Sequence, residues 1–332
     1  MHARRRRLVI ALDIGATAVK LLELGGSKRR LSVASCAIAP LPPEAVVDRR
    51  IADINTVGSA IRQALRHCGS RTRDAVLAIP EPAVIRKVVS IPAVTDATEL
   101  ESQVELAATR HMPFPIEQLH FDFQVLGPAH GHQQHIDVLL VAAHSTAVAA
   151  RIAVCELGGL HPRVIDTELD ALAHAATLLA DGFADDGRGK TIAVIDTGAG
   201  QTLLTVLHDM ATIYTHRQPV GDLRITHTAR RRCGQADTVP SRCERLGRHL
   251  NHMLDHFLTS TGGRPLDQVV LSGGGANTAD IAPWLQARID VPVSLANPLH
   301  GLLTGRRVNR RALMPHGPAL MLACGLALRR FD

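Results

Sequence analysis

The spacing of apolar and polar residues predicts a strand, a tight turn and a second strand near the start of the chain. The segment Leu8–Leu24, LVIALDIGATAVKLLEL, is an apolar run that meets an aspartate, turns at a glycine and continues with alternating apolar positions. This pattern is typical of two adjacent strands. The segment Ile192–Leu207, IAVIDTGAGQTLLTVL, repeats the same order of residue types. Such an internal repeat predicts that two parts of the chain share one architecture.

The rest of the chain alternates between strand and helix patterns. Apolar residues at helical spacing over Asp53–Cys68, followed by Gly69, predict an amphipathic helix. Further helices are expected over residues 96–110, 146–157, 168–179, 242–258, 278–288 and 318–330. Strands are expected over residues 31–39, 75–79, 83–91, 136–142, 162–165 and 269–276. This alternation predicts an α/β protein, and the polar segment Ala184–Lys190 is taken as the main boundary between its halves.

Both repeats place an aspartate at the end of a buried strand. A buried charge is costly unless a metal ion, a hydrogen-bond donor or water meets it, so Asp13 and Asp196 form a candidate pair. The glycines that follow them are expected to let the backbone turn tightly and bring its N–H groups near an anion. These glycines are Gly15, Gly198 and Gly200. Taken alone, each hairpin is better explained by ordinary turn residues, and the repetition favours the functional reading.

A third glycine-rich stretch lies later in the chain. Gly273, Gly274 and Gly275 follow a predicted strand, and Asn277 and Thr278 open the helix expected after them. A backbone can approach a nucleotide closely at such a strand-to-helix connection. A simple loop is the alternative for this stretch by itself. Together with the two aspartate hairpins, it predicts a nucleotide site.

Composition and charge narrow the setting of the protein. The 332 residues are 46% hydrophobic and 20% charged, as in ordinary globular chains, and no apolar run reaches the length of a membrane span. The six cysteines are scattered without a C-x-x-C motif, which favours reduced thiols and a cytoplasmic location. The net charge of +6 comes in arginine clusters, but only 2% of residues are aromatic. Because so few aromatic side chains are available to stack on bases, we expect no nucleic-acid partner. An anionic membrane surface is a better candidate than nucleic acid for contact with the arginine clusters.

One segment concentrates the phenylalanines. Three of the six lie close together at Phe114, Phe121 and Phe123. Phe114 stands between Pro113 and Pro115, which cannot continue the preceding helix. Packing within the protein is one explanation. A groove for the apolar side chains of a partner is the other.

The two aspartate hairpins and the glycine cluster resemble the split signature of the actin, sugar kinase and Hsp70 superfamily. Within it, the chain resembles the PilM family of type IV pilus assembly proteins, which is similar in fold to the division protein FtsA. The resemblance rests on segments that follow one another along nearly the whole chain: ALDIGATAVKLLEL, RHMPFPIEQLHFDF, the stretch 138–176, VIDTGAGQTLLTVL, VVLSGGGANTADIAPWL and GPALMLACGLALR.

This resemblance implies an α/β actin-like ATPase fold, with duplicated RNase H-like domains around a nucleotide cleft and an FtsA/PilM-type 1C subdomain. The implied boundaries are 1–91 and 161–188 with a C-terminal helix at 315–332 for subdomain 1A, 92–160 for 1C, 189–222 and 266–314 for 2A, and 223–265 for a reduced 2B.

The resemblance also implies residue roles around ATP or ADP with Mg²⁺. Asp13 and Asp196 would hold the hydrated metal ion, and Glu168 lies where related ATPases carry an acidic residue near the attacking water. The nucleotide would contact Gly15, Ala16, Thr17, Lys20, Gly198, Gly200, Gln201, Gly273, Gly274, Gly275 and Asn277. Two departures stand out: Leu169 replaces the usual proline, and 233–248 lacks the acidic helix that contacts ribose and adenine. We therefore expect a slow ATPase at most, with nucleotide acting as a structural switch.

The implied partner is the cytoplasmic N-terminal tail of PilN, held in a groove bordered by Pro113, Phe114, Pro115, Phe121 and Phe123. The protein would then be cytoplasmic and peripheral at the inner membrane, would meet components of the pilus motor, and would couple nucleotide state to pilus biogenesis and twitching motility. Two alternatives stay open. One is a small-molecule kinase of the same superfamily, and the other is a nucleotide-free pseudo-ATPase scaffold or filament protein.

Overall fold

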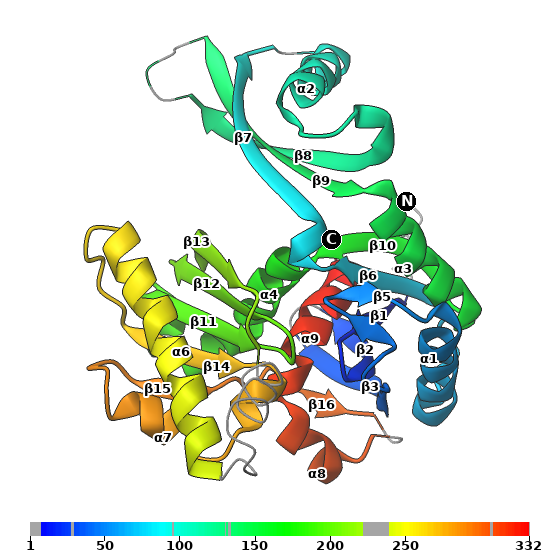
Figure 1. Cartoon of the computed structure of the whole chain (residues 1–332), viewed down its shortest axis with the longest axis vertical. Helices are drawn as coiled ribbons and strands as arrows, with labels where there is room; N and C mark the ends of the chain where they lie inside the picture. The colour runs from blue at the N-terminus through cyan, green and yellow to red at the C-terminus, as the bar shows by residue number, and fades with distance from the viewer. Residues whose placement is uncertain are drawn as a thin grey trace. The chain divides into compact units, whose positions relative to one another are not determined.

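The chain folds into two compact units (Figure 1). The structure, a computed structural model, describes residues 8–27, 30–94, 96–129, 131, 134–221, 239–305 and 308–331. The larger unit is formed by residues 1–78 together with 154–332, and the smaller unit by residues 79–153. The larger unit therefore encloses the smaller one in sequence.

The first sheet of the larger unit has the strand order β10-β6-β1-β2-β3-β16. Its central strand, β1, pairs antiparallel with β2 and parallel with β6. All five residues of β1 are buried, which explains why this strand reads as a continuous apolar run. The strands are β1 (Ile10–Ile14), β2 (Ala18–Ser27), β3 (Arg30–Pro40), β6 (Asp74–Ile79), β10 (His161–Thr167) and β16 (Leu303–Thr304).

The second sheet repeats this arrangement, with the order β13-β12-β11-β14-β15. Its central strand β11 again pairs antiparallel with the next strand, β12, and parallel with β14. The strands are β11 (Thr191–Thr197), β12 (Thr202–His208), β13 (Ala211–Gln218), β14 (Gln268–Ser272) and β15 (Val293–Leu295). The series β3-β2-β1-β6-β10 therefore has its counterpart in β13-β12-β11-β14-β15, as the internal repeat predicts.

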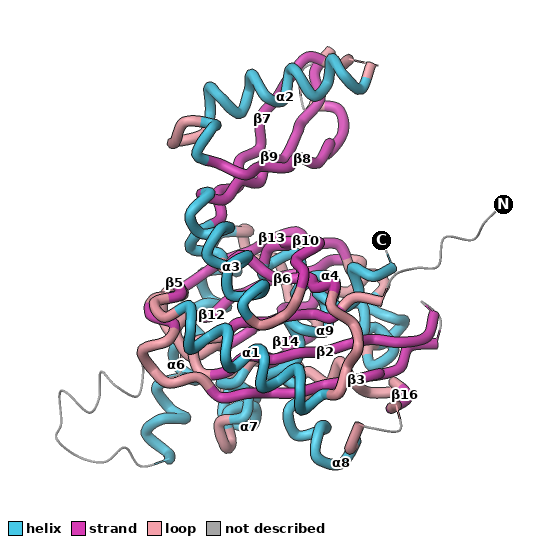
Figure 2. Tube along the Cα trace, turned by 90° about the vertical axis from the view of Figure 1, so that its right-hand side faces the viewer, coloured by secondary structure: helices cyan, strands magenta, loops and turns pink. Residues whose placement is uncertain are grey.

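One long helix covers the outer face of each sheet. Helix α1 (Ile54–Cys68) begins at the predicted Asp53, whose side chain accepts a hydrogen bond from the Thr56 N–H, and ends at Gly69 in the left-handed region. It packs on the first sheet across β2 and β3 (Figure 2). Helix α6 (Val239–Ser260) buries Leu250 and Phe257 against the second sheet in the equivalent way. Helix α7 (Ile281–Gln286) lies beside α6.

Two further helices meet in the centre of the larger unit. They are α4 (Glu168–Ala176), which comes directly after β10, and α9 (Met321–Leu328), which comes after β16. A Cβ atom at Gly325 would overlap the carbonyl oxygen of Ala171, so the two backbones touch at this crossing. Residues of both sheets join α4 and α9 in one hydrophobic cluster. A short helix, α8 (Arg310–Leu313), precedes α9.

The smaller unit is a sheet of order β7-β9-β8 with one face covered by α2. Helix α2 (Ala97–His111) begins at Asp96, whose side chain accepts a hydrogen bond from the Glu99 N–H. The strands are β7 (Val84–Pro92), β8 (Leu119–Pro128) and β9 (His135–His144). Helix α3 (Ser145–Leu157) leads the chain out of this unit.

The unit boundaries differ from the sequence-based expectation. The smaller unit spans 79–153 where 92–160 was expected, because β7 pairs with β9 from Val84 to Pro92 and so belongs to that sheet. The division between the two compact units does not fall at 184–190, although this segment lies between β10 of the first sheet and β11, with which the second sheet begins. Of the expected subdomain 223–265, residues 223–238 lie outside the described residues. Helix α6 lies in the remaining part and packs on the second sheet. The subdomain division within the larger unit stays a prediction.

Candidate functional site

The turns of the two central hairpins close in the same way. The N–H of Gly15 donates to the carbonyl oxygen of Ala18 at 3.0 Å, and the N–H of Gly198 donates to that of Gln201 at 2.9 Å. Each bond leaves two residues at the tip of its turn, Ala16 and Thr17 in one, Ala199 and Gly200 in the other. The hairpins that the sequence pairs are therefore alike in backbone geometry as well as in residue type.

In the first hairpin the aspartate is paired with a cation. Asp13 is buried at the end of β1, and its carboxylate accepts a hydrogen bond at 2.8 Å from the ammonium group of Lys20. The two residues are direct partners in the pairing of β1 with β2, where opposite charges attract across the strands. The sequence-based assignment of both to one site is consistent with this contact.

In the second hairpin the aspartate has a neutral partner. The Ser272 hydroxyl, on the neighbouring strand β14, donates to Asp196 at 3.0 Å. Burial raises the pKa of Asp196, and the negative charge of Asp13 raises it further, while Lys20, the Ser272 hydrogen bond and Arg49 act in the opposite direction. Asp196 therefore lies within the electrostatic influence of Asp13 and Lys20 of the first hairpin.

A third carboxylate, Glu168, joins this group. It is the first residue of α4 and is buried. Its Oε2 accepts a hydrogen bond from the Gln201 side-chain amide at 2.6 Å, and its Oε1 forms an ion pair with Arg49. The structure thus connects the candidate acidic residue directly to the turn of the second hairpin. Sequence reasoning missed Arg49, because an Asp-Arg pair is not a usual signature of a tight hairpin turn.

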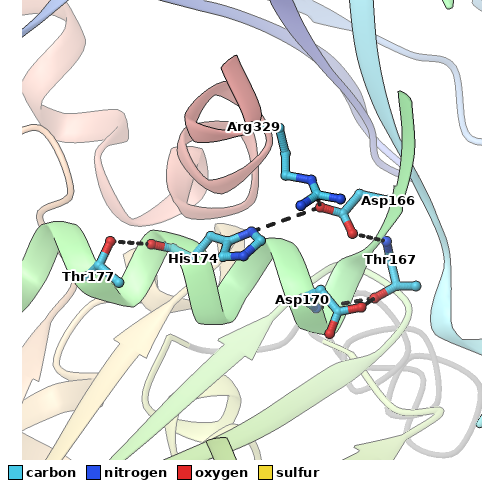
Figure 3. Close-up of polar contacts among 6 residues, drawn as sticks. All are labelled: Asp166, Thr167, Asp170, His174, Thr177 and Arg329. Carbon is cyan, nitrogen blue, oxygen red and sulfur yellow. Dashed lines mark hydrogen bonds and ion pairs between the residues drawn. The ribbon is translucent and has the colours of Figure 1, made fainter. Parts of the chain in front are cut away.

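The start of α4 is fixed by a set of polar contacts (Figure 3). The Asp166 carboxylate accepts a hydrogen bond from the Thr167 N–H at 2.8 Å and lies 3.1 Å from Nε of Arg329, next to the end of α9. The Thr167 hydroxyl donates to Asp170 at 2.6 Å and caps the helix. Burial raises the pKa of Asp166, and the positive charge of Arg329 opposes this shift. These contacts hold the residue before Glu168 in place and tie α4 to the C-terminal segment.

The glycines of the two hairpin turns differ in conformation from the first glycine of the later cluster. Gly15, Gly198 and Gly200 do not adopt left-handed φ angles, so the turns do not depend on that freedom. Gly273 does, with φ of 82°, and a Cβ there would overlap the backbone of Thr197 at the end of β11. The first glycine of the cluster therefore lets two strand ends of the protein approach each other. Gly274 and Asn277 are exposed on the short 3₁₀ turn that follows.

The residues present fit a nucleotide with a magnesium ion. Carboxylate oxygens are the ligands that Mg²⁺ prefers, and Asp13 and Asp196 supply them. The side-chain oxygen of Gln201 is buried with no hydrogen-bond partner within the described ranges, which is a position that a bound group can satisfy. No cluster of three or more metal-binding side chains occurs in the described part of the chain.

The phenylalanine segment divides between core and surface. Phe121 and Phe123 are two residues apart on β8, so their side chains lie on the same face of the sheet. This is the face that α2 covers. Both side chains thus contribute to packing, and their assignment to a partner groove stays a prediction. Phe114 is exposed and lies edge-on against the ring of His144, with ring centroids 5.6 Å apart. Pro113 and Pro115 are exposed beside it.

Solved structures confirm the actin-like fold. One, described as the PilM-PilN type IV pilus biogenesis complex, is 25% identical over 98% of both chains and superposes with a TM-score of 0.80. Another, the ethanolamine utilization protein EutJ from Carboxydothermus hydrogenoformans, is 15% identical over 97% of this chain and 89% of its own, with a TM-score of 0.56. The predicted α/β fold class is therefore correct.

A family model extends the match to the sequence itself. The model for the type IV pilus assembly protein PilM matches residues 11–238 and 239–331, which is almost the whole chain and includes both aspartate hairpins. None of the described helices is both long enough and apolar enough to cross a membrane. With its repeated sheets, its paired turns and this match, the chain belongs to the PilM family of type IV pilus assembly proteins.

Proposed function

We propose that this protein is the nucleotide-binding component of a type IV pilus assembly platform and that it binds the cytoplasmic N-terminal tail of PilN. The observation that carries the nucleotide part is the pair of turns closed by the same hydrogen bond, each placed after a strand whose second-last residue is an aspartate. Two such turns offer backbone N–H groups to phosphate oxygens from two sides. The family and fold place these turns in an actin-like protein.

The charges at this site favour a nucleotide that arrives with a divalent cation. Asp13, Asp196 and Glu168 outnumber the cations Lys20 and Arg49 among the side chains described there. A polyphosphate alone would add negative charge to a site that already has an excess of it. Bound Mg²⁺ would supply the compensating positive charge. Lys20 would then contact phosphate while Asp13 and Asp196 hold the hydrated ion.

The surroundings of Glu168 are consistent with slow turnover. A general base must have an oxygen available to the attacking water, and Gln201 and Arg49 contact both Glu168 oxygens. At least one of these contacts must break before Glu168 can act as a base, which would slow hydrolysis and let bound nucleotide act as a switch. On this basis we infer that nucleotide state, rather than rapid hydrolysis, is coupled to pilus biogenesis and twitching motility.

The partner part of the proposal rests on the structural relative. That relative was solved in complex with PilN, and its similarity extends over 98% of this chain. In the smaller unit, Phe114 offers an exposed aromatic ring of the kind that anchors apolar peptide side chains. Binding to a membrane-anchored PilN would hold the protein at the cytoplasmic face of the inner membrane.

Calorimetry with Mg-ATP tests the nucleotide part. Asp13→Asn and Asp196→Asn should each weaken binding about tenfold or more, because each removes a charge that holds the hydrated ion. Asp255→Asn, at an exposed position of α6, is the matched control and should bind as the unmodified protein does. Failure of the unmodified protein to bind any nucleotide would leave a scaffold without a nucleotide switch.

Capture of a synthetic PilN N-terminal peptide tests the partner part. Phe114→Ala should lose the peptide, since truncating an aromatic anchor that the peptide buries costs about 2 kcal/mol or more of binding. Leu106→Ala is the matched control, because Leu106 lies in the same unit and both side chains are 46% exposed. Equal capture by both variants would move the binding surface away from Phe114.

A further inference from the structure

The short hairpin between β3 and α1 contains an unusual turn. Strands β4 (Val46–Val47) and β5 (Arg50–Ile51) pair through a turn whose two central residues, Asp48 and Arg49, have φ of 47° and 68°. A two-residue turn with both φ angles positive strongly favours asparagine or aspartate followed by glycine. The chain has arginine where glycine would be the least strained choice. A residue kept at such a position against its backbone preference suggests a role for its side chain.

The Arg49 side chain points inward from this turn. It is 12% exposed, although it carries a charge, and it forms an ion pair with Glu168. Burial lowers the pKa of Arg49, while the negative charges of Asp13 and Asp196 act to raise it. The guanidinium therefore lies within the electrostatic influence of all three site carboxylates. Burying a long charged side chain is costly, so its place among these carboxylates calls for an explanation beyond the turn itself.

The contacts of Glu168 connect Arg49 to the second hairpin. One Glu168 oxygen contacts Arg49, and the other accepts the hydrogen bond from Gln201, the residue that closes the second turn. A change of partner at Arg49 would thus alter the contacts of Glu168 and, through them, those of Gln201. The same series of contacts reaches α4, whose first residue is Glu168.

A guanidinium binds phosphate and carboxylate with the same fork of N–H donors, so the two anions compete for it. From these contacts we propose that Arg49 is a phosphate-binding residue of the nucleotide site, held by Glu168 until the terminal phosphate of a nucleoside triphosphate replaces that carboxylate. The inference rests on the proposed nucleotide binding and adds to it a means of telling triphosphate from diphosphate. A diphosphate leaves the Arg49–Glu168 pair intact, whereas a triphosphate releases Glu168 and the Gln201 side chain bonded to it.

The experiment measures Mg-ATP and Mg-ADP affinities of the full chain by calorimetry. Arg49→Gln should weaken ATP binding by about 10- to 100-fold, as expected for the loss of a charged hydrogen bond, and should change ADP binding by less than about threefold. Arg49→Lys, which keeps the charge, should recover part of the ATP affinity. Arg50→Gln is the matched control, because Arg50 is the neighbouring residue of the same hairpin and is exposed.

A second variant keeps the proposal open to refutation if Arg49→Gln fails to fold. Glu168→Gln leaves the arginine in place and removes the anion that competes for it. It should therefore tighten ATP binding more than ADP binding. Hydrogen exchange of residues 46–51 should also change when ATP is added to the unmodified protein, and should change little when ADP is added.

The outcomes separate this inference from the proposed function. If the unmodified protein binds neither nucleotide, the proposed nucleotide binding fails and the role of Arg49 fails with it. If it binds both nucleotides and the Arg49 and Glu168 variants leave the ratio of ATP to ADP affinity unchanged, only the role of Arg49 is overturned. Arg49 would then only stabilise the start of α4 through its ion pair with Glu168.

Discussion

The two sheets of the larger unit repeat one order of strands, yet the aspartates on their central strands have different partners. Asp13 meets the ammonium group of Lys20 on the antiparallel neighbour of its strand, whereas Asp196 meets the hydroxyl of Ser272 on the parallel neighbour. The duplicated backbone thus positions both carboxylates, and the side chains around them have diverged. One half contributes a fixed positive charge to the site, and the other contributes neutral hydrogen bonding and a carboxylate whose pKa is raised by burial.

The halves also differ in the segment that comes after the parallel neighbour of the central strand. After β6 the chain leaves to form the smaller unit, and after β14 it makes the close turn at Gly273. Phe114, which we assign to partner binding, belongs to the insertion in the first half. The second half keeps the glycine-rich turn next to the proposed nucleotide. A duplicated unit has therefore acquired a different specialisation at the same point of each copy.

The largest effect is expected where the halves touch. Gly325→Ala should cost about 3 kcal/mol or more of unfolding free energy, because the added methyl group overlaps the Ala171 carbonyl at the crossing of α4 and α9. Urea denaturation measures the loss. Gly182→Ala is the matched control, because a Cβ there meets no atom within 4 Å. Equal stability of the two variants would show that the crossing adjusts and that the halves are not locked together.

A smaller effect should separate the two aspartates. Lys20→Met leaves the buried Asp13 carboxylate without its cation and should cost about 2 to 3 kcal/mol of unfolding free energy, less than a fully buried pair because Lys20 is partly exposed. Ser272→Ala removes one neutral donor from Asp196 and should cost about 1 kcal/mol. Denaturation of the nucleotide-free protein gives both values. Equal costs would contradict the asymmetry between the hairpins.

The smallest effect depends on pH and concerns the outer face of the second half. His216 on β13 stacks on His256 of α6 with ring centroids 4.3 Å apart. Burial lowers the pKa of His216, and the charges of His256, His252 and Arg217 lower it further. Protonation is therefore less favourable in the folded state, so stability should fall as pH drops below the ordinary histidine value of about 6.5.

The variant His216→Gln should lose part of this pH dependence and match the unmodified protein near pH 8. Thermal unfolding followed from pH 8 to pH 5 measures it. His300→Gln, at an exposed position of the same unit, is the matched control. An unchanged pH profile in His216→Gln would mean that the histidine stack does not influence stability.

Sequence patterns predicted the parts of the site that follow directly from strand chemistry. A charged residue that ends an apolar run is conspicuous, and this is why Asp13 and Asp196 could be paired in advance. Arg49 could not be found in this way, since its turn lacks the usual residues and its partner Glu168 is distant in sequence. Only the fold brings them together.

Composition read without periodicity left other features undecided. The concentration of phenylalanines suggested a single groove, but the alternation in β8 sends Phe121 and Phe123 to the face under α2. Strand β13, which pairs with β12, was missed because its sequence is largely polar and lacks an apolar run. Side-chain direction within an element, which requires the element to be known first, decided both cases.

Helix α9 has a consequence for how the protein is made. It is apolar on all sides, its residues are buried from Met321 to Ala327 except for a half-buried Leu322, and it completes the cluster that contains parts of both sheets. During translation the ribosome delivers α9 after every other element of that cluster. Until then, the nascent chain exposes the apolar surfaces of both halves, which makes the unfinished protein a substrate for chaperones. The proposed nucleotide site would therefore assemble only after α9 has been synthesised.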